Sequence, residues 1–141
     1  GGIVGPDPEP WEARGEQLAE ARAVWESAGI DSYVYDLTRI CYACGGDDLA
    51  VTVTDGVVTG AVGGEGEPVP EGALPTVETV AGLFDVVERA IDREADGFEV
   101  RYDPELGYPT LIDLDPDRHA IDEEIRYEAS DLAPLVPFDE W

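Results

Sequence analysis

The order in which two hydrophobic periodicities follow one another along the chain restricts its fold more than any other feature. Apolar side chains recur at three- and four-residue spacings over residues 11–28, and the flanking Pro10 and Gly29 are typical of a helix start and a helix end. A second helical segment is predicted with Thr76 as its N-cap and Gly97 as the residue that closes it. Alternation of apolar and polar residues predicts strands at 32–40, 48–54, 57–62, 98–102, 110–115 and 124–130.

The connections between these strands are short, which favours antiparallel pairing. Asp55-Gly56 separates two runs of β-branched residues by two positions, and this is a strong signal for a β-hairpin. The predicted fold class is α+β, with two αβββ halves whose two helices pack on one face of a largely antiparallel sheet. This layout resembles that of β-lactamase-inhibitory proteins and of PepSY-type domains.

The composition along the chain predicts its domain organisation. Residues 1–10 hold three prolines among acidic residues and are expected to form a flexible tether. Residues 11–132 are expected to form a single α+β domain with a Gly- and Pro-rich loop at 60–76, and residues 133–141 a C-terminal tail.

Acidic residues dominate the charge of the chain. It has 8 Lys and Arg residues against 33 Asp and Glu residues, so its formal net charge at pH 7 is −25. Nucleic-acid binding depends on cations that neutralise phosphates, and anionic membranes attract basic patches, so both partner classes are excluded. A protein or ligand of positive charge is the expected partner.

Other features of the sequence favour a compartment outside the cytoplasm. The chain contains no Met, and its first ten residues resemble the tether that an exported protein retains after processing. No apolar run approaches the roughly 18 residues that a transmembrane helix needs. We therefore expect an extracytoplasmic bacterial protein that is secreted or lipid-anchored to the cell envelope.

Cys41 and Cys44 are the two cysteines of the chain and have the spacing Cys-x-x-Cys. A local disulfide in an oxidising compartment is expected. One alternative is a redox dithiol, although such a pair normally begins at a helix N-terminus. The other alternative is a zinc site, which needs four ligands, whereas His119 is the one histidine available.

Four acidic residues match part of the ligand spacing of an EF-hand loop, in which carboxylate oxygens bind Ca²⁺. The first, third, fifth and twelfth positions of that loop are occupied by Asp113, Asp115, Asp117 and Glu124. Arg118 stands at the sixth position, where a glycine normally makes the sharp turn. We expect no cofactor, with calcium at this acidic turn as the alternative.

Tyrosines are the candidates for a binding surface. Tyr33, Tyr35 and Tyr108 are expected to line one surface of the sheet beside acidic groups, which suits a cationic or carbohydrate partner. The sequence contains no Gly-x-Ser-x-Gly elbow, no glycine-rich phosphate loop and no His-Glu-x-x-His motif. We therefore expect no enzymatic activity.

Several longer segments together resemble a known family. They are CYAC at 41–44, VTVTDGVV at 51–58, TVETVAGLFDVVERAI at 76–91, YDPELGYPTLIDLD at 102–115 and DEEIRYEASDL at 122–132. On these segments the chain is similar to the bacterial domain of unknown function 6174, over about residues 11–132. The resemblance implies an exported or lipoprotein-like domain and supplies no catalytic residues.

The sequence thus predicts a non-catalytic cell-envelope or secreted domain that binds a protein or another ligand. The alternative is a calcium-responsive domain that uses the acidic turn at 113–124. The third class is a thiol–disulfide oxidoreductase that uses Cys41 and Cys44.

Overall fold

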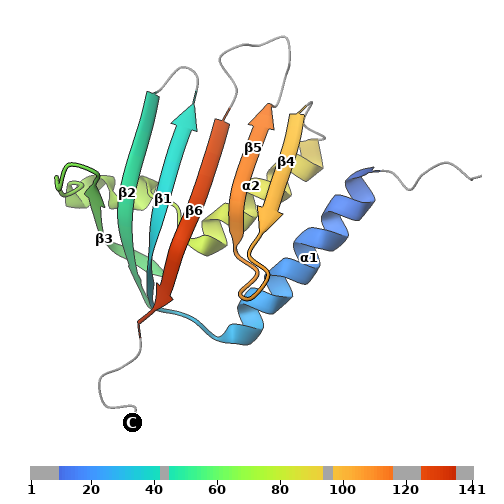
Figure 1. Cartoon of the computed structure of the whole chain (residues 1–141), viewed down its shortest axis with the longest axis horizontal. Helices are drawn as coiled ribbons and strands as arrows, with labels where there is room; N and C mark the ends of the chain where they lie inside the picture. Colours follow the sequence, from blue (N-terminus) through green and yellow to red (C-terminus); the bar gives the residue numbers. More distant parts are fainter. Residues whose placement is uncertain (1–9, 42–44, 94–96, 116–124, 136–141) are drawn as a thin grey trace, which may run out of the picture.

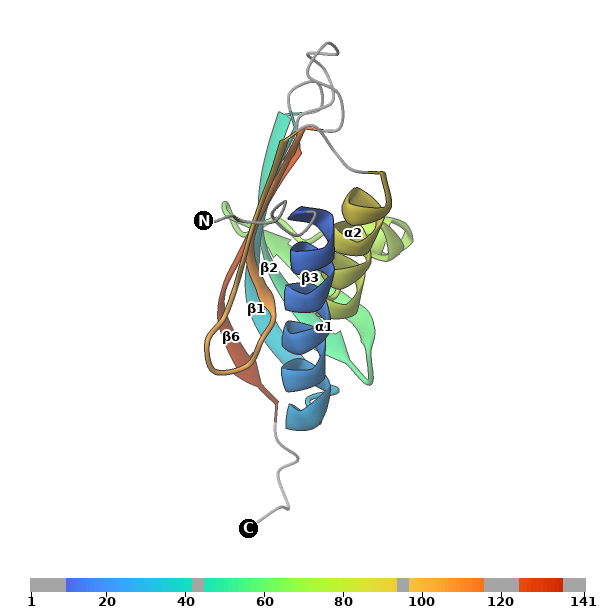
Figure 2. The ribbon, with the colours of Figure 1, turned by 90° about the vertical axis from the view of Figure 1, so that its right-hand side faces the viewer.

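The fold has two layers, a six-stranded antiparallel sheet and two helices that lie on one of its faces (Figure 1). The computed structural model describes residues 10–41, 45–93, 97–115 and 125–135. Seen from the edge of the sheet, α1 (Pro10–Ala28) and α2 (Val80–Arg93) lie on the same side of it (Figure 2). The predicted α+β class, the two helices and the antiparallel sheet are therefore confirmed. No helix in the described part of the chain is long and apolar enough to cross a membrane.

The sheet has the strand order β3-β2-β1-β6-β5-β4, and all neighbouring strands are antiparallel. Its strands are β1 (Tyr33–Cys41), β2 (Gly45–Thr54), β3 (Val57–Gly63), β4 (Gly97–Tyr102), β5 (Pro109–Asp115) and β6 (Ile125–Pro134). All six predicted strands are present. β6 continues to Pro134, so it includes the first two residues of the predicted tail. The central pair of the sheet, β1 and β6, joins the first strand of the chain to the last.

The Asp55-Gly56 hairpin forms as predicted. Both residues have positive φ, 51° at Asp55 and 81° at Gly56. Two consecutive left-handed residues define a type I′ turn, whose twist matches that of the two strands it connects. Thr54 and Val57 therefore pair directly across the turn.

Alternation along the strands separates a core face from an open face. Most of the side chains that point toward the helices are apolar or aromatic, with Arg39 as an exception, and many of them are buried. They include Tyr33, Tyr35, Leu37, Leu49, Val51, Val53, Ala61, Ile112, Leu114, Tyr127 and Ala129. The intervening side chains point to the opposite face, which no helix covers (Figure 2). Antiparallel sheets tolerate one solvated face because their polar side chains can all be placed on it.

The first helix packs through a narrow apolar stripe and ends at a glycine. Leu18, Ala21 and Trp25 of α1 are buried, and the Trp25 ring meets Tyr33 edge-on with centroids 5.3 Å apart. Gly29 follows the helix with φ of 64°, and its N–H donates to the carbonyl of Glu26 at 3.1 Å. This left-handed C-terminal cap is the one that the sequence predicts.

The second helix begins later than predicted, so the prediction of Thr76 as its N-cap is wrong. Thr76 ends a short 3-10 helix, η1 (Glu71–Thr76), and its hydroxyl donates to the carbonyl of Ala73 at 2.6 Å. Thr79 is the cap instead, because its hydroxyl oxygen accepts the N–H of Gly82 at 3.0 Å. Both Thr76 and Thr79 precede the helical pattern at a distance that suits an N-cap, and the packing of the chain selects Thr79.

The predicted Gly- and Pro-rich loop at 60–76 is more ordered than expected. It contains the end of β3 and all of η1, and a bridge pairs Val62 with Pro68. The side chain of Leu74 is buried against the core. The returning chain also donates the N–H of Val69 to the carbonyl of Ala61 at 2.8 Å. This segment therefore covers part of the exposed edge of β3, which would otherwise offer unpaired backbone groups to another chain.

The turn between β4 and β5 is packed directly against the backbone of α1. Gly107 has φ of 84°, and a Cβ placed on it would lie 2.4 Å from the carbonyl oxygen of Ala21. The carboxylate of Asp103 holds the turn by accepting the N–H of Leu106 at 2.7 Å. The next residue, Tyr108, is buried and meets Trp25 edge-on at 6.4 Å. The Gly-Tyr-Pro motif at 107–109 thus has a structural role in docking the first helix.

Candidate functional site

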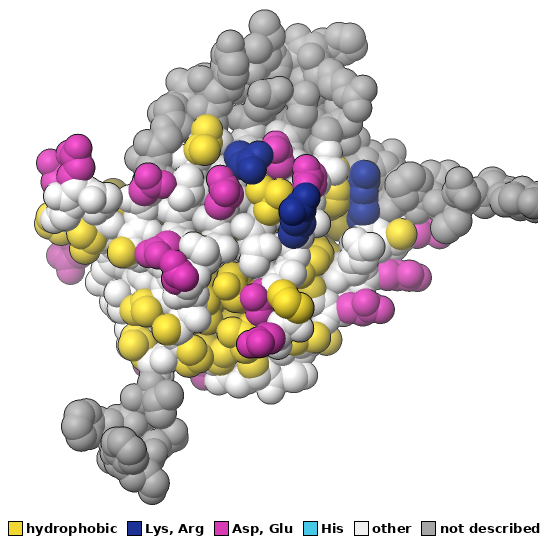
Figure 3. Space-filling view, in the orientation of Figure 1, with side chains coloured by type: hydrophobic (Ala, Val, Ile, Leu, Met, Phe, Trp, Pro, Cys, Tyr) yellow, Lys and Arg dark blue, Asp and Glu magenta, His cyan; other side chains and the backbone are white. Residues whose placement is uncertain are grey.

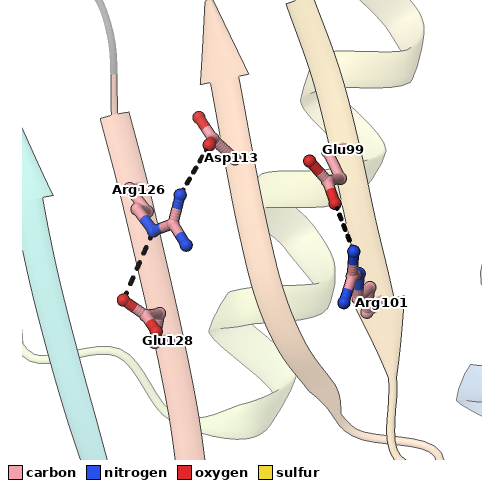
Figure 4. Close-up of polar contacts among 5 residues, drawn as sticks. All are labelled: Glu99, Arg101, Asp113, Arg126 and Glu128. Carbon is pink, nitrogen blue, oxygen red and sulfur yellow. Dashed lines mark hydrogen bonds and ion pairs between the residues drawn. The ribbon is translucent and has the colours of Figure 1, made fainter.

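The open face of the sheet carries acidic side chains over its whole extent, whereas basic side chains lie only over its β6-β5-β4 side (Figure 3). Arg126 of β6 lies between two acids, with one guanidinium nitrogen 2.9 Å from Asp113 and another 3.3 Å from Glu128 (Figure 4). Arg101 of β4 lies 2.9 Å from Glu99. These pairs are exposed and contribute less than about 1 kcal/mol each. The acids of these pairs nevertheless neutralise the charges of Arg101 and Arg126 on the β6-β5-β4 side.

The β2-β1 side of the open face has a different charge balance. The hydroxyl of Thr38 donates to the carboxylate of Asp48 at 2.8 Å across the two strands. Asp36 lies on β1 next to a bulge in β6, where Asp131 has a left-handed φ of 55°. Partial desolvation, a hydrogen bond with the Asp131 side chain and the negative charge of Asp131 raise the pKa of Asp36. Two carboxyl groups thus share one hydrogen bond at this bulge.

A groove of about 480 Å³ runs over this acidic side. The residues that line it come from β1, β2, the end of β3 and β6, and none of them is Lys or Arg. They are Asp36, Leu37, Thr38, Asp48, Leu49, Ala50, Val62, Gly63, Gly64 and Ser130. Ile40 and Val62 also project from the open face with 43% and 40% of their surface exposed. The groove therefore combines carboxylates with exposed aliphatic side chains.

The tyrosines predicted to form a binding surface lie on the other face of the sheet. Tyr33, Tyr35 and Tyr108 are only 3%, 2% and 5% exposed. Their rings are core side chains beneath the helices and present no surface to a partner. The correction has a simple reason: alternation places Tyr33 and Tyr35 on the same face as the fully buried Leu37.

The hydroxyl groups of Tyr33 and Tyr35 anchor the second helix. The N–H of Val80, the first residue of α2, donates to the Tyr33 hydroxyl at 2.8 Å. The Tyr35 hydroxyl donates to the carbonyl of Glu78. Burial raises the pKa of Tyr33 to about 12, and burial together with neighbouring negative charge raises that of Tyr35 further. Both groups are therefore neutral hydrogen-bonding groups at physiological pH.

A polar cluster between the sheet and the start of α2 was not predicted from the sequence. Arg39 of β1 lies 3.3 Å from the carboxylate of Glu78 and donates to the carbonyl of Thr76 at 3.0 Å. Tyr127 is hydrogen-bonded to the Glu78 side chain, and burial raises its pKa to about 12. The available signal was Arg39 itself, which occupies a core-facing position in an otherwise apolar alternation. A charge there requires a partner from the covering layer.

The predicted calcium ligands fall mostly outside the described residues. Asp117 and Glu124 lie outside them, and nothing is described of the Asp115 side chain. Asp113 lies on the open face, where its carboxylate is already paired with Arg126. Among the residues that the structure describes, no group of three or more metal-ligating side chains comes together. The calcium site remains a prediction.

The predicted disulfide also remains untested, because Cys44 lies outside the described residues. Cys41 is the last residue of β1, and β2 begins at Gly45. The cysteine pair therefore spans the connection between two paired strands. A catalytic dithiol normally takes its acidity from a helix N-terminus, and Cys41 follows a strand instead.

The fold and the open face define a class: a two-layer α+β domain with an uncovered antiparallel sheet face rich in carboxylates. The chain belongs to a family of unknown function (DUF6174), which matches residues 17–134. No curated protein and no solved structure matches the chain. The family resemblance found in the sequence is thereby confirmed, and the match covers α1 from residue 17 onward, all of α2 and all six strands.

Proposed function

We propose that this chain is a non-catalytic binding domain whose open sheet face receives a positively charged protein segment. The observation that carries the proposal is the groove over β1 and β2, which is lined by Asp36 and Asp48 and by no basic residue. Carboxylates that face solvent without a basic neighbour attract cations of a partner and steer its approach.

The distribution of arginines strengthens this argument. Both arginines that project from the open face in the described part of the chain are held by acids, Arg101 by Glu99 and Arg126 by Asp113 and Glu128. The β2-β1 side keeps its carboxylates uncompensated, and Asp36 and Asp131 face each other there. A lysine or arginine of a partner would relieve this repulsion.

The aliphatic side chains of the same face fit such a partner. Ile40 and Val62 are exposed near the groove, and the long stems of lysine and arginine pack well on apolar surface while their charged ends reach carboxylates. An extended basic segment of a protein matches this mixture better than a small inorganic cation does. The binding role without chemistry is supported by the resolved pKa shifts, most of which belong to core tyrosines.

We also propose that the domain acts outside the cytoplasm of a bacterium, as a secreted or lipid-anchored protein. The support is the Cys41–Cys44 pair, whose place between two strands suits a structural disulfide. The order of helices and strands is compatible with two αβββ halves and with the layout of PepSY-type and β-lactamase-inhibitory domains. The two αβββ halves and the likeness to these two types of domain are both proposals about the origin of the fold.

The test is a binding titration with a labelled peptide of alternating lysine and alanine, followed by fluorescence anisotropy. The double variant Asp36→Asn/Asp48→Asn should bind roughly fivefold or more weakly, since each removed charge contact is worth up to about 1 kcal/mol. The matched control is Glu16→Gln/Glu20→Gln, which removes the same charge from the exposed side of α1. The control should bind within about twofold of the wild type, because charges beyond a Debye length of about 10 Å are screened.

Equal losses in the two double variants would show that the peptide responds to net charge alone, and the groove would then be rejected as the site. Loss confined to the groove variant, together with weaker binding at high salt, would support it.

A further inference from the structure

A second cavity lies on the helix side of the sheet, away from the acidic groove. It is a cleft of about 850 Å³ on the flank of α2, and η1, the start of β3 and Tyr127 of β6 complete its lining. The β2–β3 hairpin curls toward the helix layer at this place (Figure 2). A volume of this size falls within the range of cavities that hold small organic molecules.

Six of the sixteen residues that line the cleft are aliphatic or proline. Val57, Val58, Leu74, Pro75, Val77 and Val86 all line it. Val57 is 63% exposed, the largest exposed fraction among the large hydrophobic side chains that project from the described surface. Leaving such a side chain in water stabilises nothing, whereas a ligand that covers it gains the hydrophobic contribution of the buried area. The body of the ligand should therefore be apolar.

Two of the four charged residues that line the cleft, Glu78 and Asp85, are paired with arginines. Glu78 at its floor is held by Arg39 at 3.3 Å and by the Tyr127 hydroxyl. Asp85 at its rim is held by Arg22 of α1 at 3.0 Å. Glu71 and Arg89 also line the cleft, and neither makes a hydrogen bond or ion pair with any residue that the structure describes.

In a chain with 33 carboxylates for 8 basic residues, Arg89 and Arg93 of α2 make no ion pair with any described residue, and of these two only Arg89 lines the cleft. The charge of Arg89 lies close enough to the Tyr127 hydroxyl to lower its pKa against the stronger effect of burial. The guanidinium thus stands beside the polar floor of a cleft that also has aliphatic walls. Guanidinium groups bind carboxylates through two parallel hydrogen bonds, which gives such a position specificity for an anionic group.

We propose that this cleft binds a small amphipathic carboxylate, with its apolar body along Val58 and Leu74 and its carboxylate at Arg89. A medium-chain fatty acid is the simplest molecule of this class. Charges of the protein beyond a Debye length are screened at physiological salt. Of the acids that line the cleft, Glu78 and Asp85 are paired with Arg39 and Arg22. The site is separate from the acidic groove on the opposite face of the sheet, so the two proposals stand or fall independently.

The test is isothermal titration calorimetry of the full chain with decanoate and with 1-decanol, below the concentrations at which either aggregates. The variant Arg89→Gln should bind decanoate about tenfold more weakly and bind decanol unchanged, because decanol has the same chain without the charge. The matched control is Arg93→Gln, one turn further along α2, which is exposed and does not line the cleft. It should leave both affinities within about twofold of the wild type.

The position of the ligand is checked by amide chemical-shift mapping. Decanoate should shift signals of residues 57–59, 74–79 and 82–89, and the Asp36→Asn/Asp48→Asn variant should bind it as the wild type does. Absence of decanoate binding, equal losses in the two arginine variants, or shifts confined to other segments would each overturn the proposal. Arg89 is exposed and unpaired among the described residues, so its replacement should leave the thermal midpoint unchanged and the comparison free of folding effects.

Discussion

Replacing Gly107 by alanine should destabilise the domain far more than the same change at another glycine of similar backbone geometry. Both Gly107 and Gly29 have left-handed φ values, 84° and 64°. A Cβ on Gly29 would meet nothing within 4 Å, whereas a Cβ on Gly107 would lie 2.4 Å from the carbonyl oxygen of Ala21 and 3.2 Å from the backbone nitrogen of Trp25. Only the substitution at Gly107 therefore creates a collision.

The expected losses follow from these two contributions. An alanine in the left-handed region costs about 1 kcal/mol, and this is the whole cost at Gly29. The collision at Gly107 involves backbone atoms of α1, which cannot rotate away, so the turn or the helix must move. Overpacking of this kind costs about 1–3 kcal/mol, so the total for Gly107→Ala is about 3 kcal/mol. For a domain of this size that corresponds to a fall in Tm of roughly 6–12 °C.

The assay is urea unfolding followed by tryptophan fluorescence and by circular dichroism. Trp25 lies beside the affected turn and reports on its packing, while circular dichroism reports on the whole fold. The slope of the free energy of unfolding against urea should be unchanged in both variants, because the surface exposed on unfolding is the same. Equal losses at Gly107 and Gly29 would refute the close approach of the β4–β5 turn to α1.

Four further outcomes are expected. Tyr33→Phe should lower the free energy of unfolding by about 1–3 kcal/mol, because it leaves the buried N–H of Val80 without an acceptor; a neutral effect in urea unfolding would contradict this. Since burial raises the pKa of Tyr33, Tyr102 and Tyr127 to about 12, above the unfolded value of 10.0, stability should be full below pH 10 and fall toward pH 12, with phenol ionisation and unfolding coinciding in absorbance. The raised pKa of Asp36 means that its deprotonation opposes folding, so Asp36→Asn should raise Tm at pH 7 and by less as the pH falls toward 4, in differential scanning calorimetry. Calcium should leave the midpoint equal to that in chelator at constant ionic strength, with magnesium as the control; a rise specific to calcium would favour the alternative site in the acidic turn.

Local periodicity was sufficient to predict the two α-helices and the six strands, but not the start of α2 or the 3-10 helix η1. Each strand has an alternating pattern that does not depend on its neighbours, and the Asp55-Gly56 turn needs only its own two residues. The central pairing of β1 with β6 was beyond this kind of reasoning. It joins segments at opposite ends of the domain, and nothing in either strand specifies the other.

The candidate site was harder to predict because alternation does not say which face of a sheet the helices cover. Tyr33 and Tyr35 share one face, and Val34 and Asp36 share the other. Tyrosine suits a core and a binding surface equally well, since its ring is apolar and its hydroxyl is polar. Leu37 lies on the same face of β1 as Tyr33 and Tyr35 and is fully apolar. It could therefore have indicated that this face packs in the core.

Three arginines of the described part connect elements that acidic residues would otherwise push apart. Arg22 joins the two helices through Asp85 and Glu88, Arg39 joins the sheet to the start of α2, and Arg126 joins β5 to β6. In a chain with so few cations, this distribution leaves the β2-β1 side of the open face without compensation. Arg89 makes no ion pair with any acid in the described part of the chain, and it lines a cleft. The two proposed sites therefore have one physical origin, the uneven placement of a small number of positive charges on an acidic fold.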